Sequence, residues 1–489
     1  MILDEILDNI IKYKENVAYT VDDNKYTYQE LYKYVCNIYH HLLIENPNRK
    51  PVVVYGSKEI FMKATFLACS FAGMSYVPID SSMSNNRVDS IIEQLEAELI
   101  VGDFKSDKVK NISKNEIEEI MNAENCKTVQ QIYLKPQDIV YIIFTSGSTG
   151  TPKGVKVTYR NLNSCVEWLK NIMKPENEVV LNQASFSFDL SVADFYLSLI
   201  NGSEHFILEK QIQTNFRELF EKLKTSNASI AVMTPSFADL LLLDKSFNEK
   251  LMPKLKKILF CGEKLLSSTV EKIYSRFKDV TVINSYGPTE CTFAVTSIEI
   301  ERNLKEENIS IGIPKKDVEI FIVNEKLEEM EDETDGEILI VGESVADGYV
   351  SGSGEAFIIY NGKKGYLTGD LGYKRDGKLY YKCRKDKQIK YKGYRIELND
   401  IETNLYKLNN FEKVVVIPKL SKENKVIKIL AFVQLKKNVV KTESEIKKEL
   451  LNIIPEYMCP NIKIIKQFPL NKNGKCDEKK LLEEYSNGR

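Results

Sequence analysis

Three glycines, five hydroxyl-bearing residues and one lysine lie together in the segment 145–155, which follows four residues that favour β-strands, 141–144. Glycine lets backbone N–H groups approach an anion closely, hydroxyl groups add hydrogen-bond donors, and lysine adds positive charge. The segment therefore predicts a loop that binds phosphate groups, although a Gly/Ser/Thr loop after a strand can also be a plain turn. It differs from the Walker A loop, because its lysine precedes the last glycine.

Four further segments combine turn-forming residues with polar or charged ones. In chain order they are a Tyr-Gly-Pro-Thr-Glu segment ending at Glu290, a Thr-Gly-Asp turn ending at Asp370, a charged stretch beginning at Arg384, and an Asn-Gly turn followed by Lys475. Each one alone is compatible with an ordinary turn or a solvated loop. Their fixed order after the phosphate loop makes them informative together.

In this order the five segments resemble the motifs of the adenylate-forming enzymes, a family that includes the adenylation domains of nonribosomal peptide synthetases, the acyl-CoA synthetases and the luciferases. The match runs from about residue 65 to residue 475 and includes the segment 73–80 and Arg87. The resemblance implies an enzyme that uses ATP and Mg²⁺ to convert a carboxylic acid into an acyl-AMP. A non-enzymatic binding module is disfavoured, because it would be expected to have lost Lys475, Glu290 or Asp370.

The resemblance also implies which side chains bind ATP and Mg²⁺. The residues of the phosphate-binding loop are Thr145, Ser146, Gly147, Ser148, Thr149 and Lys153. Tyr286 would lie against the adenine, since a purine suits a flat apolar ring. Thr289 would contact the α-phosphate, and Glu290 would hold Mg²⁺, which prefers a carboxylate together with phosphate oxygens.

Three residues of the C-terminal part complete the implied nucleotide site. Asp370 would bind the two ribose hydroxyls, and Arg384 would contact the ribose as well. The family usually has glycine before this arginine, whereas this chain has Cys383, which could alter the local turn. Lys475 matches the catalytic lysine that bridges the substrate carboxylate and the α-phosphate, and a mobile point charge suits a phosphate whose negative charge grows in the transition state.

The segment 186–192 indicates the class of acid that is activated. By the resemblance, Asp189 pairs with the α-ammonium group of an amino acid, and it stands among apolar residues. The same carboxylate would be a costly unpaired charge beside a fatty acid, so an acyl-CoA synthetase is the weaker alternative. The positions implied to line the amino-acid pocket are Asp189, Leu190, Ala193, Val232, Cys261, Ser285, Phe293 and Ala294.

A narrower resemblance is to the D-alanine ligases that load a separate carrier protein for D-alanylation of lipoteichoic acid. It is carried by the segments 181–192, 234–237, 260–263 and 294–297. Cys261 would crowd the substrate Cα and favour the D-isomer, and the carrier's phosphopantetheine thiol would accept the aminoacyl group. Ala193, Ser285 and Phe293 depart from the methionine, threonine and valine expected there. These departures leave open another small amino acid, as in a stand-alone nonribosomal peptide synthetase adenylation enzyme.

The elements that must position these residues alternate along the chain. β-Rich runs alternate with helical ones, which is typical of an α/β fold whose mainly parallel sheets are covered by helices. The predicted strands are 51–55, 75–78, 98–101, 228–233, 257–260 and 280–283, and the predicted helices are 58–72, 87–97 and 237–243. From about residue 309 to 381, strands and turns predict a β-rich subdomain.

Two domains are predicted, 1–385 for binding ATP and the amino acid, and 386–489 as a small mobile α+β lid that carries the catalytic lysine. By the resemblance, Asp386 is the hinge about which the lid turns, and Gly393 lines the tunnel for pantetheine. The predicted lid elements are helices 399–408 and 443–454 and strands 413–417 and 428–434.

Composition disfavours several other classes of function. The chain has 489 residues, and its 68 basic and 70 acidic residues give a net charge of -2, so it has no electrostatic footprint for nucleic acid or an anionic membrane. We find no apolar run of about 18 residues, the length that would span a membrane. Nine dispersed cysteines without a C-x-x-C pair and only three histidines disfavour a zinc site, a disulfide framework and His-based catalysis. We therefore expect a cytoplasmic enzyme with reduced thiols.

Overall fold

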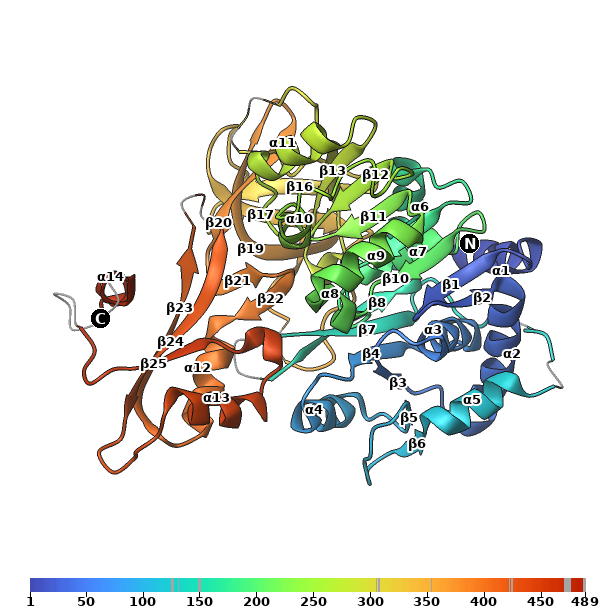
Figure 1. The fold of residues 1–489 in the computed structure, drawn as a ribbon, viewed down its shortest axis with the longest axis horizontal. Helices are drawn as coiled ribbons and strands as arrows, with labels where there is room; N and C mark the ends of the chain where they lie inside the picture. The colour runs from blue at the N-terminus through green and yellow to red at the C-terminus, as the bar shows by residue number, and fades with distance from the viewer. Residues whose placement is uncertain are drawn as a thin grey trace. The chain divides into compact units, whose positions relative to one another are not determined.

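The computed structural model describes residues 1–124, 127–130, 132–147, 151–304, 306, 308–352, 354–421, 423, 425–469 and 476–486. The chain forms two compact units. The first consists of Met1–Ser81, Ile91–Phe144 and Lys153–Lys385, and the second of Ser82–Ser90, Thr145–Pro152 and Asp386–Arg489. Figure 1 labels the helices and strands of both.

Within the described residues, the first unit contains a nine-stranded sheet of order β15-β14-β13-β12-β11-β9-β10-β1-β2. The strands from β13 to β1 are parallel, and β14, β15 and β2 add antiparallel edges. The strands are β1 (Val17–Val21), β2 (Asn24–Thr27), β9 (Val179–Asn182), β10 (Glu204–Ile207), β11 (Ile230–Met233), β12 (Lys257–Phe260), β13 (Thr281–Tyr286), β14 (Thr296–Glu299) and β15 (Ile313–Pro314).

The two faces of this sheet are covered by different helices. Successive residues of a strand point to opposite faces, so Ile230 and Val232 pack into one hydrophobic cluster and Ala231 and Met233 into another. The second cluster contains residues of α9, α10 and α11, and the first contains residues of α6 and α7. Because both faces are buried, β11 is a continuous apolar run, as parallel strands commonly are.

A six-stranded sheet of order β6-β5-β3-β4-β7-β8 also lies in the described part of the chain. Its strands are β3 (Val52–Gly56), β4 (Tyr76–Asp80), β5 (Leu99–Val101), β6 (Lys110–Ile112), β7 (Ile139–Thr145) and β8 (Lys153–Thr158). From β6 to β7 its pairs are parallel. These strands and the helices between them confirm the predicted α/β alternation.

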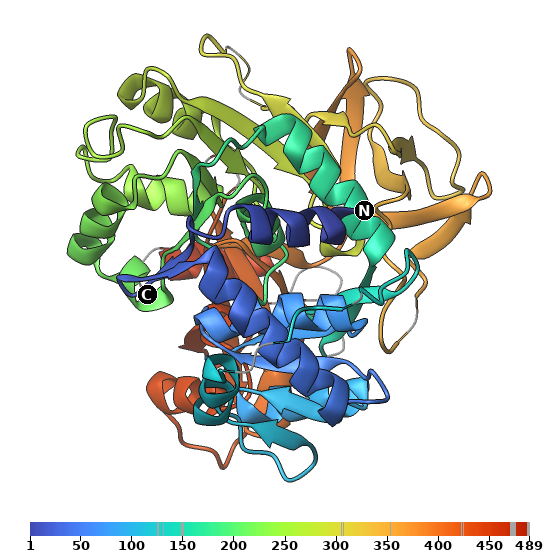
Figure 2. The ribbon, with the colours of Figure 1, turned by 90° about the vertical axis from the view of Figure 1, so that its right-hand side faces the viewer.

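Three helices of the N-terminal part, α2, α5 and α6, begin where their sequences supply capping boxes. The side chains of Thr27, Ser113 and Thr158 each accept a hydrogen bond from the third residue of the helix that follows, forming capping boxes. The helices are α1 (Ile2–Lys12), α2 (Tyr28–Glu45), α3 (Ile60–Ala72), α4 (Asn85–Leu95), α5 (Lys114–Asn122), α6 (Tyr159–Met173), α7 (Leu190–Ser198), α8 (Lys210–Thr214), α9 (Phe216–Ser226), α10 (Pro235–Leu241) and α11 (Ser267–Arg276). Figure 2 shows α1 beside α6, where the Leu3 N–H donates to the Tyr159 hydroxyl at 3.0 Å.

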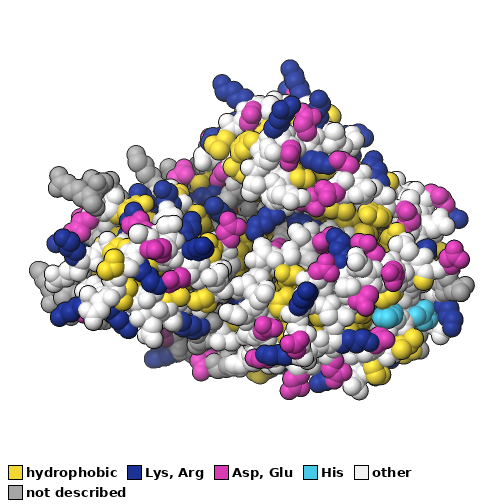
Figure 3. All heavy atoms as spheres, turned by 60° about the horizontal axis from the view of Figure 1, so that its bottom comes forward, with side chains coloured by type: hydrophobic (Ala, Val, Ile, Leu, Met, Phe, Trp, Pro, Cys, Tyr) yellow, Lys and Arg dark blue, Asp and Glu magenta, His cyan; other side chains and the backbone are white. Residues whose placement is uncertain are grey.

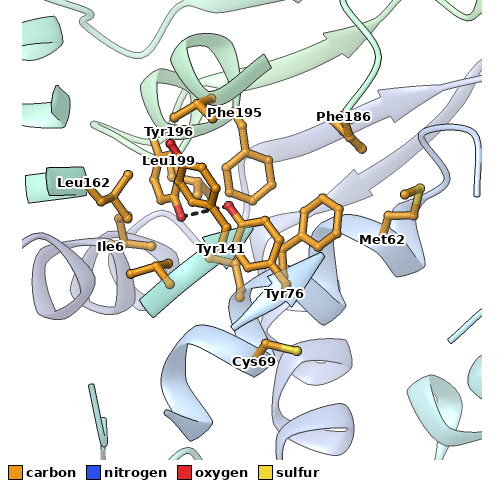
Figure 4. Close-up of a cluster of buried hydrophobic side chains, with 14 of the residues drawn as sticks. Ile6, Met62, Cys69, Tyr76, Tyr141, Leu162, Phe186, Phe195, Tyr196 and Leu199 are labelled. Carbon is orange, nitrogen blue, oxygen red and sulfur yellow. Dashed lines mark hydrogen bonds between the residues drawn. The ribbon is translucent and has the colours of Figure 1, made fainter. Parts of the chain in front are cut away.

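Helix α7 lies in the interior, and all nine of its residues are buried. Figure 4 shows Phe195 and Tyr196 of this helix close to Tyr76 and Tyr141 of the six-stranded sheet. The Tyr76 and Tyr196 hydroxyls are 3.3 Å apart. Since α7 also packs on β9, β10 and β11, it touches both sheets.

The predicted β-rich segment forms an antiparallel sheet in the first unit. Its strands are β16 (Val318–Val323), β17 (Gly336–Gly342), β18 (Phe357–Tyr360), β19 (Lys363–Arg375) and β20 (Lys378–Arg384). The long strand β19 carries Asp370 directly opposite Arg384 of β20.

The second unit contains a small α+β assembly. Strands β23, β24 and β25 form a sheet whose apolar residues pack against α12 and α13, and β21 and β22 form a hairpin. Its elements are β21 (Gln388–Tyr391), β22 (Tyr394–Glu397), α12 (Leu398–Lys407), β23 (Phe411–Leu420), β24 (Val426–Leu435), α13 (Glu443–Leu451), β25 (Asn461–Ile464) and α14 (Glu478–Ser486).

Charged residues of both signs are mixed over the surface. Figure 3 shows Lys and Arg side chains interspersed with Asp and Glu over one face, in keeping with the small net charge. Among the described residues, no helix has both the length and the hydropathy needed to cross a membrane.

Candidate active site

The predicted phosphate-binding loop connects two strands of the six-stranded sheet. Strand β7 ends at Thr145 and strand β8 begins at Lys153. Ser148, Thr149 and Gly150 of this loop lie outside the described residues. A strand therefore precedes the loop, as the β-forming residues 141–144 predict.

The end of the loop is packed tightly against an aromatic ring. A Cβ atom at Gly154 would lie 2.7 Å from the Phe144 ring, so a larger residue would have to displace that ring. Lys153 Nζ lies 5.4 Å from the centre of the Tyr349 ring, within the range of a cation–π interaction. The ring of Tyr349 thus lies beside the lysine that the sequence predicts to bind phosphate.

Ser146 belongs to the second unit and contacts its hairpin. The Ser146 hydroxyl donates to the Arg395 carbonyl at 2.9 Å and accepts from the Glu397 N–H at 3.2 Å. In the same unit, the Arg87 guanidinium lies 3.6 Å from the buried Asp400 carboxylate. Burial raises the pKa of Asp400, and Arg87 opposes that shift by favouring the charged carboxylate.

The structure brings together Tyr286, Asp370 and Arg384, which are far apart in the sequence. The Tyr286 hydroxyl donates to Asp370 Oδ2 at 2.6 Å, and Arg384 Nη1 lies 3.0 Å from Asp370 Oδ1. Arg384 also donates to the Thr368 carbonyl at 2.7 Å. Burial, followed by the nearby Asp370 charge, raises the pKa of Tyr286, so its hydroxyl keeps its proton and donates. The three side chains that the sequence predicts for adenosine therefore form one buried cluster.

Glu290 is a buried carboxylate with a hydrogen-bond donor that the sequence did not predict. It lies in the short helix η1 (Thr289–Cys291), next to Thr289, which is also buried. The Tyr349 hydroxyl donates to Glu290 Oε1 at 2.7 Å. Tyr349 lies outside every motif, because only the folding of a distant loop brings it to Glu290, and no local pattern marks it.

The chemistry around Glu290 fits a magnesium ion that is bound jointly with phosphates. Among the described residues there is no group of three His, Cys, Asp or Glu side chains that could hold a metal ion by itself. Mg²⁺ is commonly held by one or two carboxylates plus substrate phosphates, and not by an all-protein cage. A single buried glutamate whose donor, Tyr349, also lies beside Lys153 is compatible with that mode.

Replacement of Tyr349 by phenylalanine is expected to weaken the use of Mg²⁺ while the ring beside Lys153 remains. One hydrogen bond contributes about 1 kcal/mol, so the Mg²⁺ concentration for half-maximal activity should rise roughly fivefold. ATP–pyrophosphate exchange at increasing MgCl₂ measures this. Tyr366→Phe is the matched control, because it removes a hydroxyl 3.4 Å from that of Tyr349 and keeps the Tyr349 hydroxyl that donates to Glu290. An unchanged Mg²⁺ dependence in Tyr349→Phe would show that the hydroxyl does not assist the carboxylate.

The residues predicted to line the amino-acid pocket gather at one edge of the nine-stranded sheet. Val232, Cys261 and Ser285 lie at or just beyond the carboxyl ends of the adjacent parallel strands β11, β12 and β13. That edge is where open α/β sheets bind their ligands. One hydrophobic cluster contains six of the predicted residues, namely Leu190, Ala193, Val232, Cys261, Phe293 and Ala294. Asp189 is partly buried and directly precedes α7.

The loop that carries Phe293 has an unusual backbone. Thr292 and Phe293 have φ values of 60° and 71°, in the left-handed region that disfavours bulky residues. A Cβ atom at Gly287 would lie 2.5 Å from Ala294 Cα, so this loop presses against the backbone after Tyr286. Strain of this kind persists where the surrounding structure fixes the chain, and it often marks a functional site.

The remaining predicted site residues belong to the second unit or lie outside the described residues. Asp386 is the first residue of the long segment of the second unit, and its Oδ1 accepts from the Gln388 N–H at 3.0 Å. Gly393 and Lys392 form the turn between β21 and β22, both with positive φ. Such a turn matches the twist of a hairpin and favours glycine. Lys475 lies outside the described residues.

Comparisons with known proteins relate the whole chain to one family of enzymes. The family model described as AMP-binding enzyme matches residues 8–350. The chain is 37% identical to the D-alanine–D-alanyl carrier protein ligase of Bacillus licheniformis, with 99% of this chain and 100% of the relative covered. It is 35% identical to the ligase of the same description from Lactococcus lactis, with 99% of each chain covered.

Solved structures show the same fold at lower sequence identity. The Vibrio cholerae adenylation domain AlmE, in complex with glycyl-adenosine-5'-phosphate, matches with a TM-score of 0.88 and 23% identity over 99% of this chain and 97% of that chain. The adenylation–PCP di-domain NpsA-ThdA from Klebsiella oxytoca matches with a TM-score of 0.81 and 20% identity over 95% and 93%.

Proposed function

Because the chain belongs to the AMP-binding enzyme family, we propose that this ATP-dependent, AMP-forming ligase activates D-alanine and transfers it to the phosphopantetheine thiol of a separate carrier protein. The observation that carries the proposal is its full-length similarity to ligases of that description. The predicted pocket residues support it, since all but one of the six that share a hydrophobic cluster have small or medium side chains, namely Leu190, Ala193, Val232, Cys261 and Ala294.

In the first half-reaction, a carboxylate oxygen of D-alanine attacks the α-phosphorus of ATP. The bond from the α-phosphorus to the bridging oxygen breaks, pyrophosphate leaves, and D-alanyl-AMP remains. Asp189 pairs with the substrate ammonium, and Lys153 and the loop 145–154 hold the β- and γ-phosphates. Lys475 offsets the charge that grows on the α-phosphate. Mg²⁺ bound at Glu290 supplies further neutralisation of the phosphates.

In the second half-reaction, the carrier thiolate attacks the carbonyl carbon of D-alanyl-AMP. A thioester bond forms, and AMP leaves with the electron pair of the broken acyl–phosphate bond. We propose that rotation of residues 386–489 about Asp386 removes Lys475 and brings Gly393 to the site for this step. A reaction that consumes ATP and needs a reduced thiol suits the cytoplasm, and lipoteichoic acid D-alanylation is the proposed destination of the product.

ATP–pyrophosphate exchange with the twenty L-amino acids, glycine and several D-amino acids tests the proposal. D-Alanine should give the fastest exchange, and a carrier protein bearing phosphopantetheine should then accept the labelled residue. Fastest exchange with an L-amino acid or with glycine would favour a stand-alone peptide-synthetase adenylation enzyme. Activity with free coenzyme A and an acid without an amine would favour an acyl-CoA synthetase.

Cys261→Ala is expected to relax the preference for the D-isomer. The thiol would lie where the side chain of an L-amino acid must point, so its removal admits the L-isomer. The space of one small group in an apolar pocket contributes about 1–3 kcal/mol of discrimination, so the D/L ratio of kcat/KM should fall about tenfold. Cys69→Ala is the matched control, because Cys69 is equally buried but lies on α3. An unchanged ratio in Cys261→Ala would remove Cys261 from the specificity site.

A further inference from the structure

A cluster of buried polar side chains packs around α7, and none of its members is a predicted site residue. Its members are fully buried and come from four elements. They are Lys63 of α3, Asn182 of β9, Asp194 and Ser198 of α7, and His205 of β10. We call these five residues the α7 polar cluster.

A continuous chain of hydrogen bonds links the members of this cluster. Asp194 Oδ1 accepts from Asn182 Nδ2 at 2.9 Å and lies 3.0 Å from His205 Nε2. Lys63 Nζ lies 3.5 Å from His205 Nδ1 and donates to the Ser198 hydroxyl at 2.9 Å. The chain therefore runs from Lys63 through His205 to Asp194.

The direction of this chain follows from the chemistry of its members. Burial and the two nearby lysines, Lys63 and Lys58, lower the pKa of His205, so the imidazole is neutral and has one donor and one acceptor nitrogen. Burial lowers the pKa of Lys63 to about 7, and the ammonium form of Lys63 can only donate, which makes Nδ1 the acceptor in that form. His205 Nε2 then carries the proton and donates to Asp194. The imidazole thus connects a buried lysine to a buried carboxylate that do not touch each other directly.

Stability alone gives little reason for such a cluster. Apolar rings surround it, with Lys63 Nζ 5.5 Å from the centre of the Phe195 ring and the Phe195 and His205 rings 6.3 Å apart. Polar groups in an apolar interior lose their hydration, and well-packed apolar residues often stabilise a core as well or better. Hydrogen bonds depend on direction as well as distance, so they fix the relative placement of the elements that they join.

The cluster holds α7 at two points on one side. Asp194 and Ser198 are four residues apart and therefore lie on the same side of the helix, one turn from each other. Ala193, a predicted pocket residue, is offset by about 100° around the helix from Asp194. Leu190 is one turn before Asp194 on the same side, and Asp189 immediately precedes the helix. The first turn of α7 is held locally by the Ser191 hydroxyl, which donates to the Phe188 carbonyl at 2.6 Å. Anchoring at Asp194 and Ser198 restricts both rotation of α7 about its axis and sliding along it.

We propose that Lys63, His205 and Asp194 are positioning residues for the amino-acid site, holding α7 so that Asp189 and Ala193 face the substrate. The inference rests on the proposed function, because it takes Asp189 as the partner of the substrate ammonium. The three residues act through α7 and do not touch the substrate.

Asp194→Ala tests the proposal directly. It leaves the buried donors of Asn182 and His205 without their acceptor. We expect the KM for D-alanine to rise about tenfold, which is the change that follows when one buried hydrogen-bonding group is left unsatisfied. The KM for ATP should stay within about twofold of wild type, because the predicted nucleotide-binding residues are on other elements. Steady-state pyrophosphate exchange gives both constants.

Asp194→Asn should restore much of the lost affinity. Asp194 Oδ1 accepts both hydrogen bonds, and Oδ2 has no hydrogen-bond partner among the described residues, so an amide oxygen can replace Oδ1. Lys63→Met should raise the same KM and serves as a second variant if Asp194→Ala does not fold. Val270→Ala is the control for lost stability, because the buried Val270 of α11 belongs to a different hydrophobic cluster from the one that contains α7.

The possible outcomes separate this inference from the proposed function. If pyrophosphate exchange by the wild type did not depend on D-alanine, the proposed function would be overturned. The KM values of the variants would then be measured for the amino acid that the wild type does activate. An active wild type with unchanged amino-acid KM in both Asp194→Ala and Lys63→Met, despite lowered melting temperatures, would overturn the positioning role. Equal rises in both KM values, or the same amino-acid effect in Val270→Ala, would also overturn it.

Discussion

Replacement of Lys475 by alanine is expected to reduce ATP–pyrophosphate exchange by about 10²- to 10³-fold or more, the loss seen when one group that stabilises transition-state charge is removed. The lysine is proposed to neutralise charge that grows on the α-phosphate only as the carboxylate attacks. Transfer from preformed D-alanyl-AMP to the carrier does not need that charge. It should therefore stay within a few-fold of wild type, measured by formation of the loaded carrier in a single turnover.

Lys472→Ala is the matched control for this substitution. Lys472 and Lys475 belong to the same short segment of the sequence after β25, so each variant removes one positive charge from that segment. Exchange at the normal rate in Lys475→Ala would contradict its catalytic assignment. Equal loss of exchange and of transfer would point instead to a damaged C-terminal unit.

Asp189→Ala is expected to abolish the preference for a substrate that carries an amine. Without the carboxylate, a substrate ammonium would enter a site with apolar walls unpaired. Breaking a buried ion pair by removing one partner costs about 3–5 kcal/mol, so kcat/KM for D-alanine should fall by roughly 10²-fold or more at this partly buried site. Propionate, which has the same carbon skeleton but no amine, should be activated as well as by the wild type or better.

Asp239→Ala controls for the loss of an aspartate elsewhere in the same unit. Asp239 lies on α10, where its carboxylate accepts from the Thr269 hydroxyl at 2.6 Å, away from the predicted pocket residues. Equal loss of activity with D-alanine and with propionate in Asp189→Ala would indicate that the substitution disrupts the fold, and does not only remove the contact with the substrate ammonium. An enzyme that kept its D-alanine activity would exclude Asp189 as the ammonium partner.

The sequence predicted the central elements well, because each one has a clear local pattern. The predicted strands 51–55 and 257–260 correspond to β3 (Val52–Gly56) and β12 (Lys257–Phe260), and the predicted helix 58–72 corresponds to α3 (Ile60–Ala72). These elements are apolar runs bounded by turn residues, which is the pattern that burial on both faces imposes. The charged stretch 383–388 ends β20, passes from the first unit to the second between Lys385 and Asp386, and begins β21. Exposed strand ends can be as highly charged as a connecting segment, so composition alone could not give these bounds.

Residues that act through long-range contacts could not be predicted in this way. Tyr349 reaches Glu290 across 59 positions, and the Lys63 contact with Ser198 joins residues 135 positions apart. Neither pair has a spacing that identifies it, because the sheet order that brings them together is a property of the whole chain. The site motifs were visible because loops that bind phosphate and ribose need particular residue types at adjacent positions.

The cluster of Tyr286, Asp370 and Arg384 has a consequence for how a nucleotide would be bound. Both carboxylate oxygens of Asp370 already accept hydrogen bonds within the protein. Immobilising a rotatable side chain on binding costs about 0.5–1.5 kcal/mol, and here that ordering occurs when the chain folds. A ribose that approaches Asp370 would meet a carboxylate whose orientation is already fixed by these hydrogen bonds. The entropy lost on binding would then come mainly from the nucleotide, and hardly from the ribose site.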